Sequence, residues 1–439
     1  MRTWKKSLYT YVVEFSEEII LYNSFMGAIA RIPKDKAEKV KNFLNFGIDD
    51  NDLEDSLALE LCMQGFMVKA DIEEEKYVRT ILEKEQESTL GLTIMPHEGC
   101  NFRCIYCYEN FENGLIKPRV MKGLKLFVKK KVERGNFSRV TCSWFGGEPL
   151  LAYDEILELS DAFMEYCSEN NVEYISSMTT NGYLLAPERV EKLIERKVLY
   201  YQITLDGPEK VHNRSRKLIG GKGTYSTIMQ NLKLLKEFDN RELTVKIRVN
   251  FFPNSLKELE DWIKYEIAPV FSMDKRFMLS FHPVRKWCGC NINDNENFDE
   301  RASLSEFITY LYRVCIKMGL SIQDVRNSLD PHGNVCYASK INSIVIGADG
   351  MLYKCTVAFD NPVNNIGVIN HDGTLNLNRV KLDMWTRDYV DRVEKCSKCS
   401  FYPSCQSKKC PLLSINFGKP SCPMIFDNID KFIVSAVYS

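Results

Sequence analysis

The stretch that decides how this sequence folds is Cys100–Cys107, which reads CNFRCIYC and follows the apolar run Leu92–Met95. Its cysteines are spaced C-x3-C-x2-C, so one short loop can direct three thiols at a single inorganic centre. Cysteine thiolates are the usual ligands of iron–sulfur clusters, and a four-iron cluster takes four of them. Only three are present in this loop, which would leave one iron open to a substrate or cofactor, as catalytic metal sites keep a position open. A structural zinc loop is the alternative, but zinc loops usually combine two C-x2-C pairs or Cys/His sets.

The spacing of the loop, with the aromatic Tyr106 before its last cysteine, resembles the signature of the radical S-adenosylmethionine (SAM) enzymes. The resemblance implies that Cys100, Cys104 and Cys107 hold a [4Fe–4S] cluster whose open iron binds the amino and carboxylate groups of SAM. It also implies that one electron splits SAM into methionine and a 5′-deoxyadenosyl radical.

Size and composition are those of an ordinary globular protein of two or three domains. The chain has 439 residues, of which 45% are apolar and 27% are charged. The net charge of -1 gives no electrostatic footprint for nucleic acid. No run of about 18 apolar residues predicts a membrane span, and the N-terminus shows no signal-peptide pattern. We therefore expect a cytoplasmic protein with neither nucleic acid nor membrane as a partner.

Segments that read as strands and helices alternate between residues 91 and 310, which predicts parallel strands with right-handed crossovers. The expected strands are Gly91–Met95, Val140–Trp144, Tyr174–Thr179, Tyr200–Thr204, Val245–Phe251 and Met278–Pro283. Six such units are too few for a closed eight-fold barrel, and the radical SAM core is a partial (β/α)6 barrel. The fold class we predict is therefore α/β. Since chemistry sits at the carboxyl ends of barrel strands, the position of the cysteine loop after the first strand agrees with this fold.

Polar motifs follow the next strands, and the resemblance assigns them to SAM. Gly146 and Gly147 would let backbone approach a ligand closely, and with Glu148 they match the G-G-E motif that holds the amino group of SAM. Thr180 and Asn181 match a T-N-G segment, Arg216 would pair with the SAM carboxylate, and Asn250 would touch the ribose or adenine. Tyr106 belongs to the same expected cofactor site. Turn formation is the alternative for the Asn-Gly and Asp-Gly-Pro segments.

Residues 1–90 read as four short strands and three helices, a small domain with winged-helix proportions. DNA binding is disfavoured, because the segment carries 12 Lys/Arg against 18 Asp/Glu and DNA recognition depends on neutralising phosphates. Many peptide-modifying radical SAM enzymes have a similar domain here, which binds the leader of a precursor peptide by strand addition. The alternative is a domain that only braces the barrel.

Sixteen cysteines are many for a cytosolic chain, and they favour metal binding over disulfides. Residues 311–439, which we expect to form a third domain, contain Cys336, Cys355, Cys396, Cys399, Cys405, Cys410 and Cys422. Their order resembles the SPASM domain of peptide maturases, which implies two auxiliary [4Fe–4S] clusters and three clusters in all. The resemblance assigns Cys396, Cys399, Cys405 and Cys422 to an outer cluster and Cys336, Cys355 and Cys410 to an inner one.

The match to the SPASM pattern has two departures. Four residues, Gln406–Lys409, precede Cys410 where three are usual, and the inner cluster has only three obvious ligands. Cys288 or Cys290 would supply the fourth, or that iron would be open to substrate. Thr356 stands where sulfatase-maturing relatives have an aspartate base, so the catalytic base stays unassigned.

The resemblance implies an oxidoreductase that modifies a ribosomally made precursor peptide, with a flavodoxin- or ferredoxin-type electron donor. The motifs most resemble the streptide-type cyclases, which join a lysine carbon to a tryptophan ring carbon. The sequence leaves three alternatives open. One is formation of a thioether between a cysteine and an α-carbon, and another is an enzyme outside peptide modification. The third is a non-enzymatic electron carrier or zinc-binding adaptor.

Overall fold

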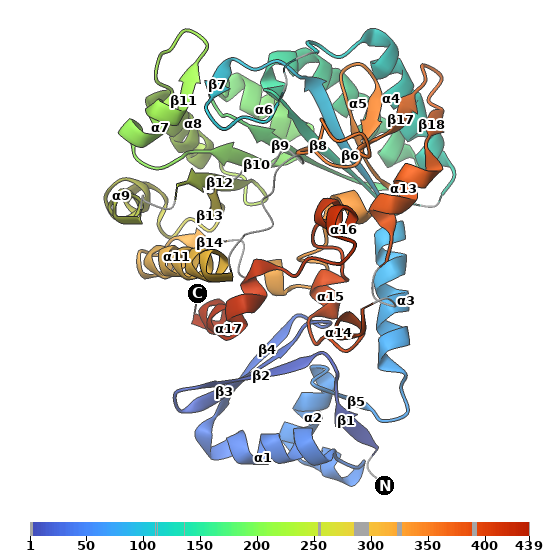
Figure 1. Cartoon of the computed structure of the whole chain (residues 1–439), viewed down its shortest axis with the longest axis vertical. Coiled ribbons are helices and arrows are strands. Elements are labelled where there is room, and N and C mark those ends of the chain that lie inside the picture. The colour runs from blue at the N-terminus through green and yellow to red at the C-terminus, as the bar shows by residue number, and fades with distance from the viewer. Residues whose placement is uncertain are drawn as a thin grey trace. The chain divides into compact units, whose positions relative to one another are not determined.

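The structure is a computed structural model that describes residues 3–109, 111, 113–135, 137–252, 256–284, 298–322, 327–388 and 393–438. The chain divides into two compact units (Figure 1). The first comprises Met1–Gln86, Asp324–Ser339 and Arg387–Ser439, and the second comprises Glu87–Gln323 and Lys340–Thr386. Cys288 and Cys290 lie outside the described residues. The predicted division into three functional domains stays a prediction.

A parallel sheet forms the centre of the second unit. Its strands are β6 (Thr89–His97), β8 (Arg139–Gly146), β9 (Glu173–Thr180), β10 (Val198–Thr204), β12 (Thr244–Phe251) and β13 (Phe277–Pro283). They lie side by side in this order, and each pairs with the next in parallel. All six overlap the strands expected from the sequence. The predicted α/β class with a parallel barrel sheet is therefore confirmed.

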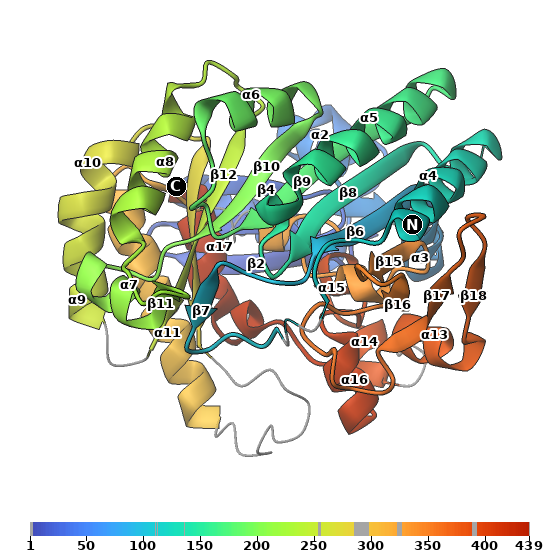
Figure 2. The same ribbon diagram turned by 90° about the horizontal axis from the view of Figure 1, so that it is seen from above.

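Helices connect these strands and cover one face of the sheet (Figure 2). They are α4 (Pro118–Glu133), α5 (Tyr153–Glu169), α6 (Pro187–Glu195), α8 (Tyr225–Glu237), α9 (Leu256–Trp262) and α11 (Phe298–Lys317). Strand β12 shows why the sheet has two different faces, because Val245, Ile247 and Val249 are fully buried whereas the residues between them are half-buried and polar. Polar side chains therefore line the concave face, where the Ser143 and Ser177 hydroxyls of β8 and β9 lie 2.8 Å apart.

The sheet continues beyond β6 with strands from late in the chain. Strand β15 (Ser343–Ile346) pairs with β6 in parallel. The lack of a side chain at Gly91 of β6 allows β15 to come close, since a Cβ added to Gly91 would lie 2.9 Å from the Ser343 hydroxyl. Three antiparallel strands follow: β16 (Met351–Tyr353), β17 (Asn365–Ile369) and β18 (Leu375–Leu377). The two-residue β14 (Ser321–Ile322) borders β13 at the opposite edge.

The first unit is built on an antiparallel sheet of β2 (Thr10–Phe15), β3 (Glu18–Asn23) and β4 (Ala28–Pro33), in that order. Helices α1 (Lys34–Phe46) and α2 (Ser56–Met63) enclose its core, where Leu21, Val40, Ile48 and Ala58 are fully buried. Strand β1 (Trp4–Lys6) pairs with β5 (Met67–Lys69), and α3 (Glu74–Glu87) follows.

The same unit contains the end of the chain. Its helices are α14 (Glu394–Ser397), α15 (Tyr402–Cys405), α16 (Pro411–Phe417) and α17 (Ile429–Tyr438). Tyr402 packs with Tyr9 and Leu82, and the ring of Phe401 lies 4.9 Å from that of Tyr11. Within the described segments, no helix combines the length and the apolarity needed to cross a membrane.

Candidate active site at the cysteine loop

The cysteine loop lies at the carboxyl end of β6 and is fixed by a short antiparallel ladder. Strand β7 (Phe102–Cys104) pairs with β11 (Arg216–Leu218), so that Cys104 stands opposite Arg216. The amides of Ile105 and Ile219 extend the ladder by donating to the carbonyls of Ser215 and Asn101, each at 3.0 Å. The loop is therefore held along its length by residues that come more than a hundred positions later.

The three thiols of the loop lie near one another. Burial, with a smaller contribution from the charges of Cys104 and Cys107, raises the pKa of Cys100 to about 12. Burial also raises the pKa of Cys104 and of Cys107. Among the described residues, no three histidine, cysteine or acidic side chains converge as the ligands of a single metal ion would. The loop supplies three soft donors, and soft thiolates are the ligands that iron–sulfur clusters take.

The G-G-E motif braces the cysteine loop from the end of β8. A Cβ at Gly146 would lie 2.5 Å from the His97 carbonyl, and one at Gly147 would lie 2.4 Å from the carbonyls of Glu98 and Gly99. The amide of Glu148 donates to the Gly99 carbonyl at 3.0 Å. The sequence suggested that these glycines let backbone approach a ligand, and the structure shows them approaching the backbone next to Cys100.

Glu148 is fully buried behind the loop. Its carboxylate accepts hydrogen bonds from the Thr180 hydroxyl and the Asn181 amide, both at 2.7 Å, and from the Leu150 amide at 3.0 Å. Burial raises the pKa of Glu148, and these hydrogen bonds act in the opposite direction. The Asn181 side-chain amide lies 3.8 Å from Cys100 Sγ and donates to the Asn101 side chain at 2.7 Å.

A buried polar network lies behind Tyr106. The Tyr106 hydroxyl donates to Asp206 Oδ2 and accepts from Arg216 Nη1 and Asn250 Nδ2, each at 3.2 Å. Burial raises the pKa of Asp206, while the charge of Arg216 lowers it. Arg216 is 5% exposed, and its Nε has no hydrogen-bond partner among the described residues. A buried guanidinium with a free donor suits an anion such as a carboxylate.

The structure therefore brings together all eight residues expected to bind SAM. Asp206 is a further member of the network, and in the sequence it was named only within an L-D-G segment that resembles the family's, with a turn as the alternative. A polar residue directly after a buried strand, at the carboxyl edge of the sheet, was the available signal. The role of each residue in cofactor binding stays a prediction.

Cys355 lies near this loop within the second unit. Burial raises the pKa of Tyr108, and the charges of Glu109, Cys107 and Cys355 raise it further. Burial also raises the pKa of Glu109 to about 8. The effect of Cys355 on Tyr108 indicates that Cys355 lies close to the residues that follow Cys107.

The cysteines expected to hold the outer cluster gather in the first unit. Burial, with smaller contributions from the charges of Cys422, Cys399 and Cys396, raises the pKa of Cys405 to about 12. In the same unit, the Cys336 amide donates to the carbonyl of Lys408, two residues before Cys410. Cys355 belongs to the second unit. Both auxiliary ligand sets stay predictions.

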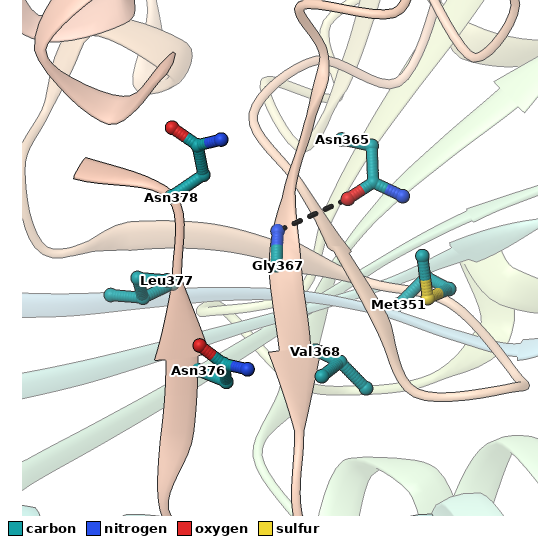
Figure 3. Close-up of a pocket in the computed structure, with 7 residues that line it drawn as sticks. All are labelled: Met351, Asn365, Gly367, Val368, Asn376, Leu377 and Asn378. Carbon is teal, nitrogen blue, oxygen red and sulfur yellow. Dashed lines mark hydrogen bonds between the residues drawn. The ribbon is translucent and has the colours of Figure 1, made fainter. Parts of the chain in front are cut away.

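A separate surface hollow of about 480 Å³ lies over β16, β17 and β18 (Figure 3). Three carboxamides line it, from Asn365, Asn376 and Asn378. Asn365 Oδ1 accepts from the Gly367 amide at 3.1 Å, so this side chain is used in shaping its own strand. The lining contains no titratable group, and we assign the chemistry to the cysteine loop.

Residues 94–265 match the family model described as Radical SAM superfamily. Residues 94–265 therefore form a radical SAM domain, as the cysteine loop predicted. Such a domain implies SAM and a [4Fe–4S] cluster as cofactors. The cysteine loop, the glycine contacts beside Cys100 and the free Arg216 Nε fit those groups.

Curated relatives include a cysteine-type anaerobic sulfatase-maturating enzyme from Clostridium perfringens, 29% identical over 158 residues. That match covers 34% of this chain and 41% of the relative. A Clostridium novyi protein of the same name is 24% identical over 343 residues, covering 73% of this chain and 87% of the relative. The chain thus spans about two fifths of the first relative and most of the second.

Among solved structures, native anSMEcpe with bound AdoMet and Kp18Cys peptide is similar to this chain at a TM-score of 0.57 and 19% identity. The alignment covers 80% of this chain and 97% of that chain. At this identity the likeness concerns the fold, and it agrees with the partial barrel described above.

Proposed function

We propose that this chain is a SAM-dependent radical maturase that forms an intramolecular carbon–carbon crosslink in a ribosomally made precursor peptide. A lysine–tryptophan bond is the favoured product. The observation that carries the proposal is the meeting of the three-cysteine loop, buried Glu148 and the free Nε of Arg216 at the carboxyl end of a parallel sheet. The sulfatase-maturating relatives and the peptide bound to anSMEcpe support a peptide substrate.

When bound, SAM and the [4Fe–4S] cluster supply a primary-carbon radical able to take hydrogen from an unactivated C–H bond. Cys100, Cys104 and Cys107 would hold the cluster, while Glu148 and Arg216 would orient the amino and carboxylate groups of SAM. The polar concave face of the sheet would position the peptide so that one carbon is within reach, which is catalysis by proximity. The protein's contribution is binding and orientation, since the cofactor carries the difficult step.

Formation of a crosslink removes two hydrogens from the peptide, so an electron acceptor beyond the first radical is needed. Cys396, Cys399, Cys405 and Cys422 would hold the outer auxiliary cluster, and Cys336, Cys355 and Cys410 the inner one. The proximity of the four outer thiols supports the first set. We further propose a flavodoxin- or ferredoxin-type donor and a reducing cytoplasm, where free thiols persist.

Strand β4 is the element to which we assign the leader of the precursor. It is an edge strand of its sheet, and an unpaired edge can accept a further strand. Ala28, Ile29 and Ala30 are half-buried, and the two alanines are small enough to leave room for an incoming backbone. Met26, 55% exposed, precedes this strand and packs towards Gly65. Methionine adapts to varied apolar partners, which suits a peptide-binding surface.

Binding of a precursor encoded beside this gene tests that assignment. Met26→Asp should weaken binding by about tenfold, since about 1.4 kcal/mol of apolar contact is lost. Met273→Asp is the matched control, because Met273 is 84% exposed in the other unit. Equal affinities for the two variants would remove the assignment of β4.

Mass spectrometry of the precursor after incubation with reduced protein and SAM tests the reaction. A loss of two hydrogens mapped to a lysine and a tryptophan is the expected result. A loss mapped to a cysteine and an α-carbon would favour the thioether alternative. An unchanged mass for all short peptides encoded nearby, with SAM still cleaved, would refute peptide modification. A protein that releases no 5′-deoxyadenosine at all would instead fit an electron carrier or a zinc-binding adaptor.

A further inference from the structure

His212 and Thr224 are buried beside the proposed SAM site, and neither belongs to the ligand sets described above. Both have no solvent exposure. His212 lies on α7 (Glu209–Ser215), which leads into β11, and Thr224 immediately precedes α8. A fully buried histidine without a carboxylate partner needs neutral hydrogen-bonding groups on both ring nitrogens.

Hydrogen bonds join these two residues to the network behind Tyr106. The Asp206 amide lies 3.1 Å from His212 Nδ1, and His212 Nε2 lies 3.0 Å from the Thr224 hydroxyl. The Thr224 hydroxyl donates to the Arg216 carbonyl at 2.8 Å. Since Arg216 Nη1 bonds the Tyr106 hydroxyl, which donates to Asp206, the five residues form a closed ring of hydrogen bonds.

The proton positions in this ring are determined by its chemistry. An amide N–H can only donate, so His212 Nδ1 must be the acceptor for Asp206. The single Thr224 hydroxyl proton goes to the Arg216 carbonyl, so His212 Nε2 must carry the other proton. The imidazole is therefore neutral. Burial, together with the charge of Arg216, lowers the pKa of His212 to about 2, in agreement with the geometry.

The ring constrains Arg216 at both ends. Its carbonyl is held by Thr224 and its Nη1 by Tyr106, while its guanidinium lies 5.5 Å from the centroid of the Phe102 ring. Its buried Nε is left without a partner among the residues that the structure describes. A side chain fixed in this way presents its Nε–H in one direction, which lowers the entropy lost on binding an anion.

We infer that His212 and Thr224 are positioning residues that fix Arg216 for the carboxylate of SAM. The inference rests on the proposed function, because it takes SAM as the anion that Arg216 receives. Neither residue touches the cofactor. Each acts through Arg216, so their loss should affect the affinity for the carboxylate more than the affinity for the rest of SAM.

Two ligands separate this role from a general effect on folding. SAM and decarboxylated SAM share the adenosyl and amino groups and differ in the carboxylate. Their dissociation constants are measured on the full chain, reconstituted anaerobically and left unreduced so that SAM is not cleaved. Thr224→Val should weaken SAM by about tenfold, the effect of misplacing one charged hydrogen bond. Decarboxylated SAM should bind to it as it does to the wild type, and the iron content should not change.

Conservative variants and a control complete the test. Thr224→Ser keeps the hydroxyl and should restore the affinity for SAM. His212→Gln keeps a donor towards Thr224 and should lose less affinity than His212→Phe, which removes both hydrogen bonds. Thr309→Val is the matched control, because Thr309 is buried and its hydroxyl bonds only to the Ser305 carbonyl of its own helix among the described residues.

Three results would overturn the inference. The first is wild-type affinity for SAM in Thr224→Val, and the second is an equal loss for SAM and decarboxylated SAM. In both, the wild-type protein still binds SAM, so the proposed function survives. The third is a wild-type protein that does not bind SAM, which refutes the proposed function and this inference together.

Discussion

Gly147→Ala is the substitution that tests most directly how the cysteine loop is held. An added Cβ would lie 2.4 Å from two backbone oxygens, those of Glu98 and Gly99, and ordinary contact begins at 3.4 Å. The strand end and the loop must therefore separate by about 1 Å, and backbone cannot rotate away as a side chain can. Overpacking of this kind costs about 1–3 kcal/mol.

The displacement falls on Gly99, which directly precedes Cys100. Because functional constellations tolerate a displacement of only about 0.5 Å, we expect Gly147→Ala to lose the cluster of this loop. Anaerobic reconstitution should then give about eight irons per chain in place of about twelve, since each such cluster holds four. Denaturant unfolding should show the second unit destabilised by about 1–3 kcal/mol.

Gly220→Ala is the matched control, because a Cβ there meets nothing within 4 Å. Iron content is measured by colorimetric assay and electron paramagnetic resonance, and stability by circular dichroism in guanidinium chloride. If Gly147→Ala and Gly220→Ala have the same iron content and the same unfolding midpoint, the close approach does not hold the loop and the reasoning is refuted.

Three further predictions concern the same unit. Cys104→Ser should abolish release of 5′-deoxyadenosine and remove about four irons per chain. Cys315→Ser, at a buried site on α11, should retain both the release and the irons. Full release of 5′-deoxyadenosine by Cys104→Ser would contradict the assignment of Cys104 as a cluster ligand. Glu148→Gln should weaken SAM binding by about tenfold, because the new side-chain NH2 would face N–H groups that need an acceptor. An unchanged affinity for SAM, measured by calorimetry, would argue against a role for this carboxylate. Burial lowers the pKa of His212 from an ordinary 6.5 to about 2, so as the pH falls this imidazole is protonated in the unfolded protein before it is protonated in the folded protein. Stability that is present above pH 6.5 is therefore lost at lower pH, by up to about 1.4 kcal/mol per pH unit. Between pH 7 and pH 5 the wild type should lose more unfolding free energy than His212→Gln, and equal losses would contradict the neutral imidazole.

The barrel strands were predictable because each carries its own local pattern. In β12, apolar and polar residues alternate from Val245 to Asn250, and this period identifies a strand without knowledge of its neighbours. Their alternation with helices predicted that the strands are parallel and joined by right-handed crossovers. The cysteine loop was identified from the spacing of its thiols, and Glu148 from the resemblance of its G-G-E segment to the family motif.

The contacts that complete the site could not be found in this way. Strands β7 and β11 have three residues each, too few to show a period, and their pairing joins distant parts of the sequence. His212 and Thr224 look like ordinary polar residues beside a turn until the fold places them on either side of Arg216. Gly147 was expected to face a ligand, but only coordinates could show that Glu98 and Gly99 occupy the adjacent space.

The contacts between the N-terminal and C-terminal parts of the chain within the first unit could not be predicted from the sequence either. Tyr402 packs with Tyr9 and Leu82 through contacts between residues hundreds of positions apart. Local patterns contain no information on such pairs, because any apolar face can be covered by any other of suitable size. The pairing is decided by the global packing of the chain.

The pairing of β7 with β11 has a consequence for anyone who transplants this loop into another barrel. Residues 100–107 are not an independent module, because Cys104 receives its backbone partner from Arg216, the same residue whose side chain we assign to SAM. A graft of the loop alone would leave behind half of its support and the proposed anion receptor. The smallest exchangeable piece is therefore two segments moved as one, and natural recombination within this family would face the same restriction.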